Sequence, residues 1–557
     1  MIFVKPEGVK ALAITLLSFV AQSFCTHATT YYVSSSQGND NNAGTSASAP
    51  WATVGKVYNA GIVSRFKPSD SILLKSGDTF SGMLWVLGNG SNGAPITISS
   101  YGTGGNPIIN GDEANVVWTN VTGYVGMYAA VPSFASQVTK VADTNGNLYT
   151  KLNQGTNTLA TWLGSFTKGN WGYSGSSKYL IYIRTLDGNP PRQMRLFLYC
   201  AVQLSAPYTI VEKMDIRRAF YGIILGATNC IARNNSIQDV FCGAIYPSVP
   251  VNQDMGSNTI TRCGYTGISL VGGRNNWVHH NNISCAASNI LGIAINGAEL
   301  CGIGLQQGTN NLVEYNTVSN VVMSCFDFWL ETSSTIRYNY GVNSGSGAYP
   351  DGTGLRFYGN IFSKNPVGIG GGHDYNSVKS AAPDAGPNLI YNNIFYGFTT
   401  NYGLYSAPGD SSRSVVRNNI FVATSSTVNL VNVNSGMDID YNTYYCTTGA
   451  PRAWYWNNTR YNTLAAFQAA SGQDRHSFYL DPQFVSANPV SAADFKLRST
   501  SPCINAGQDL KLAGLLAPTQ QYQDFLGRLI PQGSGADIGP YEASSLLPAS
   551  GLHVISQ

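Results

Sequence analysis

The segments VHHNNI (residues 278–283), VEYNTV (313–318) and IRYNYG (336–341) share one pattern. Each begins with an apolar residue, continues with two polar or aromatic residues, and then has an Asn, any residue and usually an apolar one. Further copies carry the same Asn, at Asn235, Asn360, Asn393, Asn419 and Asn442. Repetition at a fixed period of a few tens of residues is typical of solenoid proteins.

The distances between these Asn residues match one coil of a β-solenoid. They are 23 residues from Asn316 to Asn339, 21 from Asn339 to Asn360 and 23 from Asn419 to Asn442. Longer gaps, 35 residues before Asn316 and 33 after Asn360, predict a coil plus an insertion. An Asn tolerates the left-handed turn conformation, and amides stacked at about 4.8 Å can bond the copies above and below. The repeat therefore predicts an all-β, single-stranded parallel β-helix.

The overall composition is consistent with this fold and excludes several classes of protein. Hydrophobic residues make up 43% of the chain and charged residues only 11%, which excludes a disordered protein. The 60 Gly and 33 Tyr are typical of short strands joined by tight turns. The formal net charge is +3 and no basic stripe stands out, so we expect no nucleic-acid partner.

The N-terminus is predicted to be a signal peptide. Lys5 and Lys10 precede an apolar run at 11–20 that is too short to span a bilayer, and cleavage is expected near Ala28. The protein is therefore expected to be secreted, to the periplasm or beyond, with no membrane span. Nine cysteines remain after cleavage, and both disulfides and buried free thiols are compatible with export.

Segments at both ends extend the pattern of the repeats. They are YYVSSSQGND (31–40), PSDSILLKSGDTFSG (68–82), FKLRSTSPCINAG (495–507) and ADIGPYE (536–542). With these segments and the Asn repeat, the sequence resembles the pectate-lyase-like right-handed parallel β-helix superfamily of secreted carbohydrate-active enzymes. The resemblance implies a polysaccharide or oligosaccharide substrate, bound in a groove on the first sheet of each coil. We expect a monomer.

The chain divides into five predicted parts. Residues 51–60 are expected to form a short helix that caps the solenoid, and a region rich in Trp and Tyr interrupts the repeats as a β-rich insertion. The parts are a signal peptide (1–28), an N-terminal cap with the first coils (29–112), the insertion (113–210), the central coils with the groove (211–445), and C-terminal coils with a closing segment (446–557).

Counting back from each Asn predicts which side chains of the first sheet face outward. The residues 13 and 11 positions before the Asn are apolar in three coils: Ile268, Leu270, Ile303, Leu305, Phe326 and Phe328. Since strand residues alternate, the residues next to them face outward. Among these is Asp327, with Gly304 before it and Ala348 expected after it. Trp329, which could stack on a sugar ring, and Gln306 are expected to bind substrate on the same face.

Hydrolysis of a glycosidic bond needs a second carboxylate near Asp327. Glu299 lies in the insertion that precedes Gly304, and Asp351 lies one coil after Asp327. Glu331 follows Trp329 at the first bend and is a candidate for substrate binding. From the sequence, Asp327, Glu299 and Asp351 are the candidate catalytic residues.

Other polar residues are candidates for substrate binding. His279, Glu314 and Arg337 each lie two residues before an Asn of the repeat, on consecutive coils, so they could form a stacked polar network. The alternative interpretation is a set of charges that pair on a solvated sheet. His373 and Asp374 follow the glycine-rich segment GIGGG, which would leave room for a ligand.

Three functions are compatible with these residues. A glycoside hydrolase would use paired carboxylates and need no cofactor. A polysaccharide lyase would remove a proton from a uronate with Arg337, Arg356, Lys364 or His373, and in similar lyases Ca²⁺ often neutralises the carboxylate. A non-catalytic carbohydrate-binding protein or adhesin is the third. The hydrolase is the leading prediction.

Overall fold

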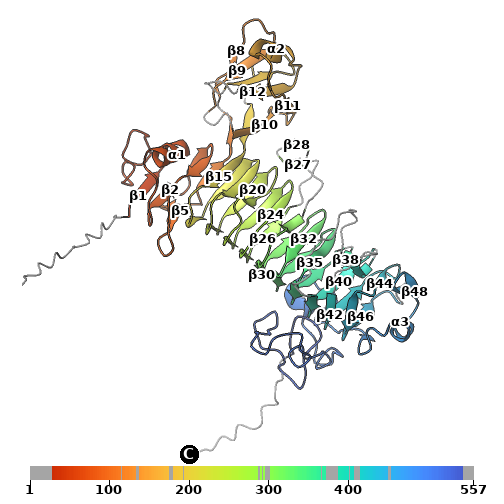
Figure 1. Cartoon of the computed structure of the whole chain (residues 1–557). Coiled ribbons are helices and arrows are strands. Elements are labelled where there is room, and N and C mark those ends of the chain that lie inside the picture. Colours follow the sequence, from red (N-terminus) through yellow and green to blue (C-terminus); the bar gives the residue numbers. More distant parts are fainter. Residues whose placement is uncertain are drawn as a thin grey trace, which may run out of the picture.

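The fold is a stack of coils built from three parallel sheets (Figure 1). In the computed structural model, each complete coil contributes one strand to the first, then the second, then the third sheet. The structure describes residues 28–543 except for 115, 133–136, 175–179, 192–193, 286–288, 291–292, 295–300, 366, 372–386, 401, 407–413 and 450–452. The predicted signal peptide, apart from Ala28, lies outside the described residues.

Each of the three sheets has thirteen strands. The first sheet consists of β4 (Leu84–Val86), β15 (Cys200–Leu204), β18 (Tyr221–Leu225), β21 (Ile245–Pro247), β24 (Thr266–Val271), β29 (Cys301–Gln306), β32 (Ser324–Thr332), β35 (Ser346–Thr353), β38 (Val367–Gly371), β41 (Tyr402–Ser406), β44 (Asn429–Val433), β47 (Ala453–Trp456) and β48 (Thr459–Tyr461). Only the last pair, β47 and β48, is antiparallel in this sheet.

The second and third sheets follow the same order along the solenoid. The second sheet consists of β1 (Thr30–Val33), β2 (Ser71–Lys75), β5 (Ile96–Tyr101), β16 (Thr209–Glu212), β19 (Ile231–Arg233), β22 (Asp254–Gly256), β25 (Trp277–His279), β30 (Leu312–Glu314), β33 (Thr335–Arg337), β36 (Arg356–Tyr358), β39 (Asn388–Tyr391), β42 (Ser414–Arg417) and β45 (Met437–Asp440). The third sheet consists of β3 (Thr79–Ser81), β6 (Ile108–Asn110), β17 (Asp215–Ala219), β20 (Ser236–Val240), β23 (Thr259–Cys263), β26 (Asn282–Ser284), β31 (Thr317–Ser319), β34 (Tyr340–Val342), β37 (Ile361–Ser363), β40 (Ile394–Phe398), β43 (Ile420–Ala423), β46 (Thr443–Cys446) and β49 (Phe478–Tyr479).

The repeated Asn forms a continuous ladder of hydrogen bonds at the bend between the second and third sheets. From Asn235 to Asn442, each Nδ2 donates to Oδ1 of the next Asn at 2.9 to 3.1 Å. The ladder includes Asn258, which the sequence pattern missed because Gly256 replaces the usual polar or aromatic residue. The parallel β-helix prediction is thereby confirmed.

The expected backbone role of the ladder Asn was wrong. The residue before it takes the left-handed conformation, as at Ser257, His280, Tyr315 and Tyr338, with φ between 54° and 56°. The ladder Asn is instead buried, and its amide also bonds main-chain groups of the adjacent coils; Asn316, for example, donates to the Val278 carbonyl at 2.9 Å. Asn is therefore required for its two-sided amide and not for its backbone freedom.

Apolar side chains from all three sheets fill the interior. The six residues predicted to face inward from the first sheet are at most 1% exposed and belong to one continuous core. In the described chain, Cys263 and Cys285 form a disulfide on neighbouring coils, and the other seven cysteines are free. Six of those seven are buried, so most cysteines act as core residues.

Helices close the solenoid near its two ends. The predicted N-terminal cap is confirmed as α1 (Val54–Val63), which begins after Thr53, whose side chain accepts a hydrogen bond from the Lys56 amide. Near the other end are α3 (Leu464–Ser471) and the 3₁₀ helix η2 (Ala492–Phe495). No helix in the described residues combines the length and apolar character needed to cross a bilayer.

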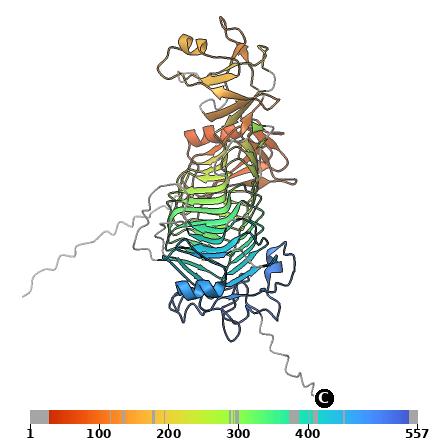
Figure 2. The same ribbon diagram turned by 90° about the vertical axis from the view of Figure 1, so that its right-hand side faces the viewer.

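The insertion is a separate eight-stranded sheet that rises from the N-terminal coils (Figures 1 and 2). Its elements are β7 (Asp112–Glu113), β8 (Thr119–Asn120), β9 (Met127–Ala130), β10 (Val138–Ala142), β11 (Leu148–Lys151), α2 (Leu159–Gly164), β12 (Asn170–Tyr173), β13 (Ile181–Arg184) and β14 (Arg195–Leu198). It ends before the predicted boundary at residue 210, because β15 and β16 already belong to a coil. Trp162 and Trp171 are buried within it. A small antiparallel pair, β27 (Asn289–Ile290) and β28 (Ile293–Ala294), lies in the later insertion before β29.

Candidate active site

Asp327 lies on the outer face of the first sheet, as predicted from the repeat. Its neighbours in the strand, Phe326 and Phe328, are completely buried in the solenoid core. Asp327 pairs with Gly304 of β29, which in turn pairs with Ser269 of β24. Asp327 is itself only 8% exposed, so neighbouring atoms cover most of it on this face.

The neighbour predicted on the other side of Asp327 was wrong. Ala348 pairs with the buried Phe326 and is itself buried, whereas Tyr349 pairs with Asp327. The register between β32 and β35 shifts between Phe328 and Glu331, as in a β-bulge, so a count back from the Asn ladder is off by one residue here. A half-buried tyrosine therefore borders Asp327 on the C-terminal side. Gly304 borders it on the N-terminal side, where Cys301 Sγ lies 3.2 Å from the position that a Cβ of residue 304 would take.

Two further predicted residues share this outer face with Asp327. Trp329 lies two residues after Asp327 and pairs with Gln306 of β29. Both side chains are half-buried, so each keeps a surface that a ligand can reach. An indole and an amide beside a carboxylate suit a sugar, because the ring stacks on the indole and its hydroxyls bond to the amide and carboxylate.

Asp351 supplies a second carboxylate on the same face. It lies two residues after Tyr349 in β35, and the alternating burial of this strand places Tyr349 and Asp351 on the same side. From strand geometry, the Cα atoms of Asp327 and Asp351 are about 8 Å apart. Glu299, the other candidate for the second carboxylate, lies outside the described residues, as do His373 and Asp374.

Glu331 is not positioned to bind a substrate, contrary to the prediction. Its side chain is completely buried at the bend after β32. One carboxylate oxygen accepts from the Gly308 amide at 2.8 Å, and the other accepts from Asn311 Nδ2 at 2.6 Å and Ser334 Oγ at 2.5 Å. Burial raises the pKa of Glu331 above its ordinary value. This carboxylate is a structural part of the turn between the first and second sheets.

His279, Glu314 and Arg337 are stacked on consecutive coils as predicted, but on the second sheet, and while Arg337 bonds Glu314, the His279 ring bonds Asp254 at 2.8 Å. The three residues pair in register on β25, β30 and β33. Glu314 accepts from Trp277 Nε1 at 2.9 Å and from Arg337 Nε at 2.7 Å, so it holds its neighbours together. The network faces away from the sheet that carries Asp327, which contradicts the predicted role in the same groove.

The basic residues proposed for a lyase also lie elsewhere. Arg337 and Arg356 belong to the second sheet, and Lys364 follows β37 at the end of a strand of the third sheet. The fourth candidate, His373, is outside the described residues. Among the described candidates, none lies on the first sheet beside Asp327.

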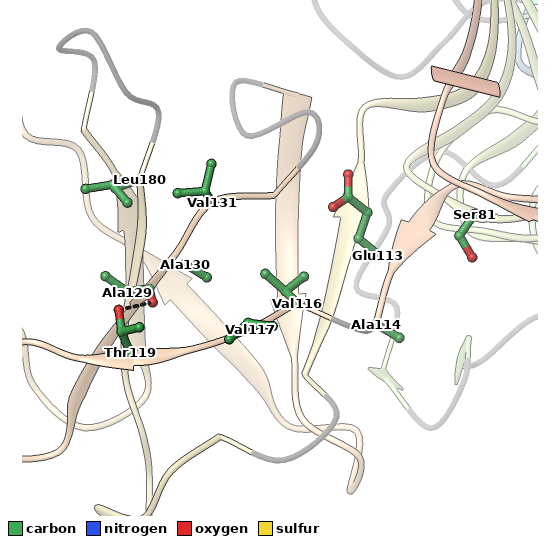
Figure 3. A pocket seen from close by; sticks show the side chains of 10 residues that line it. All are labelled: Ser81, Glu113, Ala114, Val116, Val117, Thr119, Ala129, Ala130, Val131 and Leu180. Carbon is green, nitrogen blue, oxygen red and sulfur yellow. Dashed lines mark hydrogen bonds between the residues drawn. The ribbon is translucent and has the colours of Figure 1, made fainter. Parts of the chain in front are cut away.

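A cavity that the sequence did not reveal lies where the insertion joins the coils. It has a volume of about 500 Å³ and is lined by Ser81 of β3, Glu113 of β7, and apolar residues of the insertion (Figure 3). On its far side, the Thr119 hydroxyl donates to the Ala129 carbonyl at 3.2 Å. The lining is mainly Val and Ala with one carboxylate. These residues belong to no repeat, so nothing in the sequence signals that they line a cavity.

Comparison with known proteins identifies the fold. The model of the family described as periplasmic copper-binding protein (NosD) matches residues 202–380. Among solved structures, XylC in complex with xylose has a TM-score of 0.51 at 15% identity, covering 77% of this chain and 86% of that chain. The chain has the right-handed parallel β-helix fold.

Curated relatives match only short segments. A lacto-N-biosidase of Bifidobacterium longum is 47% identical over 85 residues, which are 14% of this chain and 5% of that protein. The uncharacterised protein YwoF of Bacillus subtilis is 28% identical over 122 residues, or 21% of this chain and 25% of that protein. The chain thus matches far less than two thirds of either relative.

The copper binding named in the family description does not fit the described residues. Nowhere in the described part of the chain do three His, Cys, Asp or Glu side chains converge as metal ligands. Within the matched range, Cys263 and Cys285 are joined to each other, and Cys230, Cys301 and Cys325 are buried. No step proposed below involves copper.

Proposed function

We propose that the protein is a glycoside hydrolase that cleaves glycosidic bonds of a polysaccharide or oligosaccharide outside the cytoplasm. The observation that carries the proposal is the pair of carboxylates Asp327 and Asp351 on neighbouring strands, on the outer face of the first sheet. Trp329 and Gln306 lie beside them on that face. Glycoside hydrolases use a pair of carboxylates to cleave the bond, and an aromatic side chain beside them can stack on a sugar ring.

In this proposal each carboxylate has one role. One, protonated, donates its proton to the oxygen of the leaving sugar, while the other activates a water molecule. The Cα atoms of Asp327 and Asp351 are about 8 Å apart, and carboxyl groups at about that separation would leave room for the water and favour inversion at the anomeric carbon. Trp329 would stack on a sugar ring.

Two further observations support hydrolysis over elimination. The described basic residues that could serve as the base of a lyase, Arg337, Arg356 and Lys364, lie away from the first sheet. The relative with 47% identity over its matched segment is named a lacto-N-biosidase, a glycosidase. The mechanism proposed here needs no metal ion.

The test is a panel of polysaccharides and oligosaccharides with product mass spectrometry. Hydrolysis adds the mass of one water molecule for each bond cleaved, whereas elimination does not. With a cleaved substrate, Asp327→Asn should lower kcat/KM about 1000-fold, because the amide can neither donate nor accept the catalytic proton. The anomer formed first, measured by NMR, should be inverted.

A matched control keeps this result specific. Asp438→Asn removes an exposed outward carboxylate of the second sheet, which pairs with Arg417 at 2.7 Å, and should leave activity unchanged. Both variants should melt near the wild-type temperature. Products without the added water would establish a lyase, full activity of the Asp327 variant would exclude this residue as catalytic, and sugar binding without any cleavage would indicate a binding protein.

A further inference from the structure

The insertion covers part of the outer face of the first sheet. Ile224 of β18 belongs to the same outward column as Asp327, because it lies between Gln203 and Tyr246 in the register. Its strand neighbours, Ile223 and Leu225, are in the solenoid core, whereas Ile224 is packed in a different apolar cluster and is 1% exposed.

That second cluster is formed largely by the insertion. It joins Ile224, Met83 and Cys200 of the N-terminal coils to side chains of the insertion strands. The contributing insertion residues are Tyr128, Val138, Val141, Tyr149, Trp171, Ile181, Ile183, Met194, Leu196 and Leu198. An apolar contact of this kind fixes the insertion on the sheet as a wall, since separating it would expose a continuous core.

The floor between this wall and Asp327 is short. It consists of three outward positions, Tyr246, Ser269 and Gly304, on the strands β21, β24 and β29. At about 4.8 Å per strand, Ile224 and Asp327 are about 19 Å apart along the column. Figure 1 shows the insertion standing beside β15 and β20 at the N-terminal end, with the remaining coils extending away from it.

Tyr246 lies at the foot of the wall. Its ring stacks on Tyr221 at a centroid distance of 4.9 Å and an angle of 23°, and both rings pack against the edge of the insertion cluster. Tyr246 is half-buried, so part of it remains accessible from the floor. Among the described residues of this column, the next two positions are small, Ser269 and Gly304, and the first large side chain beyond them is Tyr246.

We infer that the insertion blocks the outer face of the first sheet at its N-terminal end and that the enzyme therefore acts at a chain end, releasing short products. This inference rests on the proposed function. A sugar residue is about as long as one strand spacing, so the three floor positions hold up to about three sugars between the wall and Asp327. Tyr246 contacts the terminal sugar of the bound chain and thereby limits the product length.

A time course of cleavage tests the inference. Wild-type protein is incubated with the longest polymer of the panel that it cleaves, and the products and viscosity are followed together. Products of up to about three sugars should dominate from the first turnovers while viscosity falls slowly. A broad ladder of long fragments with a rapid loss of viscosity would overturn the inference and leave hydrolysis intact. Absence of cleavage across the panel would overturn the proposed function as well.

Substitutions of Tyr246 test its part in the wall. Tyr246→Ala should raise KM about tenfold for short oligosaccharides, because it removes the contact between the ring and the sugar. Tyr246→Phe keeps the ring and should have a KM near that of the wild type. The matched control is Tyr441→Ala, which removes a ring that stacks on His476 at the bend beyond the second sheet. This variant should have the KM and the product length of the wild type. Melting curves confirm folding of each variant. An unchanged KM and product length in the folded Tyr246→Ala variant would overturn the assignment.

Discussion

The outer faces of the first and second sheets are made of the same repeats but carry different chemistry. On the second sheet, charged side chains bond to each other across neighbouring strands, as Arg233 does to Glu212 at 2.8 Å and Arg337 to Glu314 at 2.7 Å. On the first sheet, the strand neighbours of Asp327 are Gly304 and Tyr349, neither of which is charged.

This difference teaches where a ligand can bind on a β-helix. In a column of alternating charges, each charged group is already paired with its neighbours on the adjacent coils, so few of its hydrogen-bonding groups remain for a substrate. A carboxylate whose strand neighbours are uncharged takes no part in such a column of ion pairs between coils. Strand β32 contains two different carboxylates, since Asp327 lies on the outer face and Glu331, four residues later, is enclosed by a turn. Three substitutions test this contrast through stability.

The largest effect on stability is expected in the Asn ladder, which supports both faces. Asn316 donates to Asn339 at 3.0 Å and to Val278 at 2.9 Å, and it accepts from the amide and the side chain of Asn281. Asn316→Ala should cost about 3 kcal/mol, because several buried polar groups lose their partners at once. Thermal and urea unfolding measure the loss.

Asn320→Gly is the control for the ladder substitution, because Asn320 has φ 54° and Gly adopts this conformation without the strain that Ala would add. Asn320 is also an Asn at a bend, but it is exposed and its amide bonds only Ser284 and Ser319, at 3.3 Å. This variant should lose less than about 1 kcal/mol. Equal losses in the two variants would show that the ladder carries no special share of the stability.

An intermediate effect is expected at Glu331. Glu331→Gln should lower the free energy of unfolding by about 2 kcal/mol at neutral pH, because the new NH₂ group would face hydrogen-bond donors that now bond the carboxylate. The loss is limited because the substitution also removes a buried charge. Activity of the folded variant should remain near wild type, in contrast to Asp327→Asn. A loss of kcat with unchanged stability would contradict the structural role assigned to Glu331.

The same substitution should alter the pH dependence of stability. Burial raises the pKa of Glu331 in the folded chain, so the folded state binds its proton more tightly than the unfolded state. The contribution of this group is therefore fully present below its unfolded pKa and is lost as pH rises through its folded pKa. The Glu331→Gln variant should lack this loss of stability at higher pH. The difference in the free energy of unfolding between the wild type and the variant, measured by urea unfolding, should therefore become smaller as pH rises.

The smallest effect is expected on the second sheet. Arg337→Ala removes a partly exposed partner of Glu314 and should cost about 1 kcal/mol, with no change in kcat or KM. Arg356→Ala, an exposed arginine on the next strand of the same sheet, provides the comparison and should cost less. A marked rise in KM for the Arg337 variant would show that the second sheet also contacts substrate.

Much of the candidate site could be predicted from the repeat. The Asn spacing sets the period, and alternation along a strand then sets the outward direction, so Asp327, Trp329 and Gln306 were placed on one face from residue counts alone. The neighbour of Asp327 was mispredicted because a register shift in β32 has no signature in the Asn spacing. Glu331 was misassigned for a related reason: the bend turns its side chain inward onto Asn311 and Ser334.

The sequence by itself determined the solenoid, its period and the faces of its strands, because these depend on local alternation and on an Asn that recurs with each coil. Only the tertiary structure decided which faces are available. The insertion packs over Ile224 of the first sheet and so buries one of its outward positions. This contact depends on which segments meet in space, and apolar burial between an insertion and a coil leaves no period in the sequence.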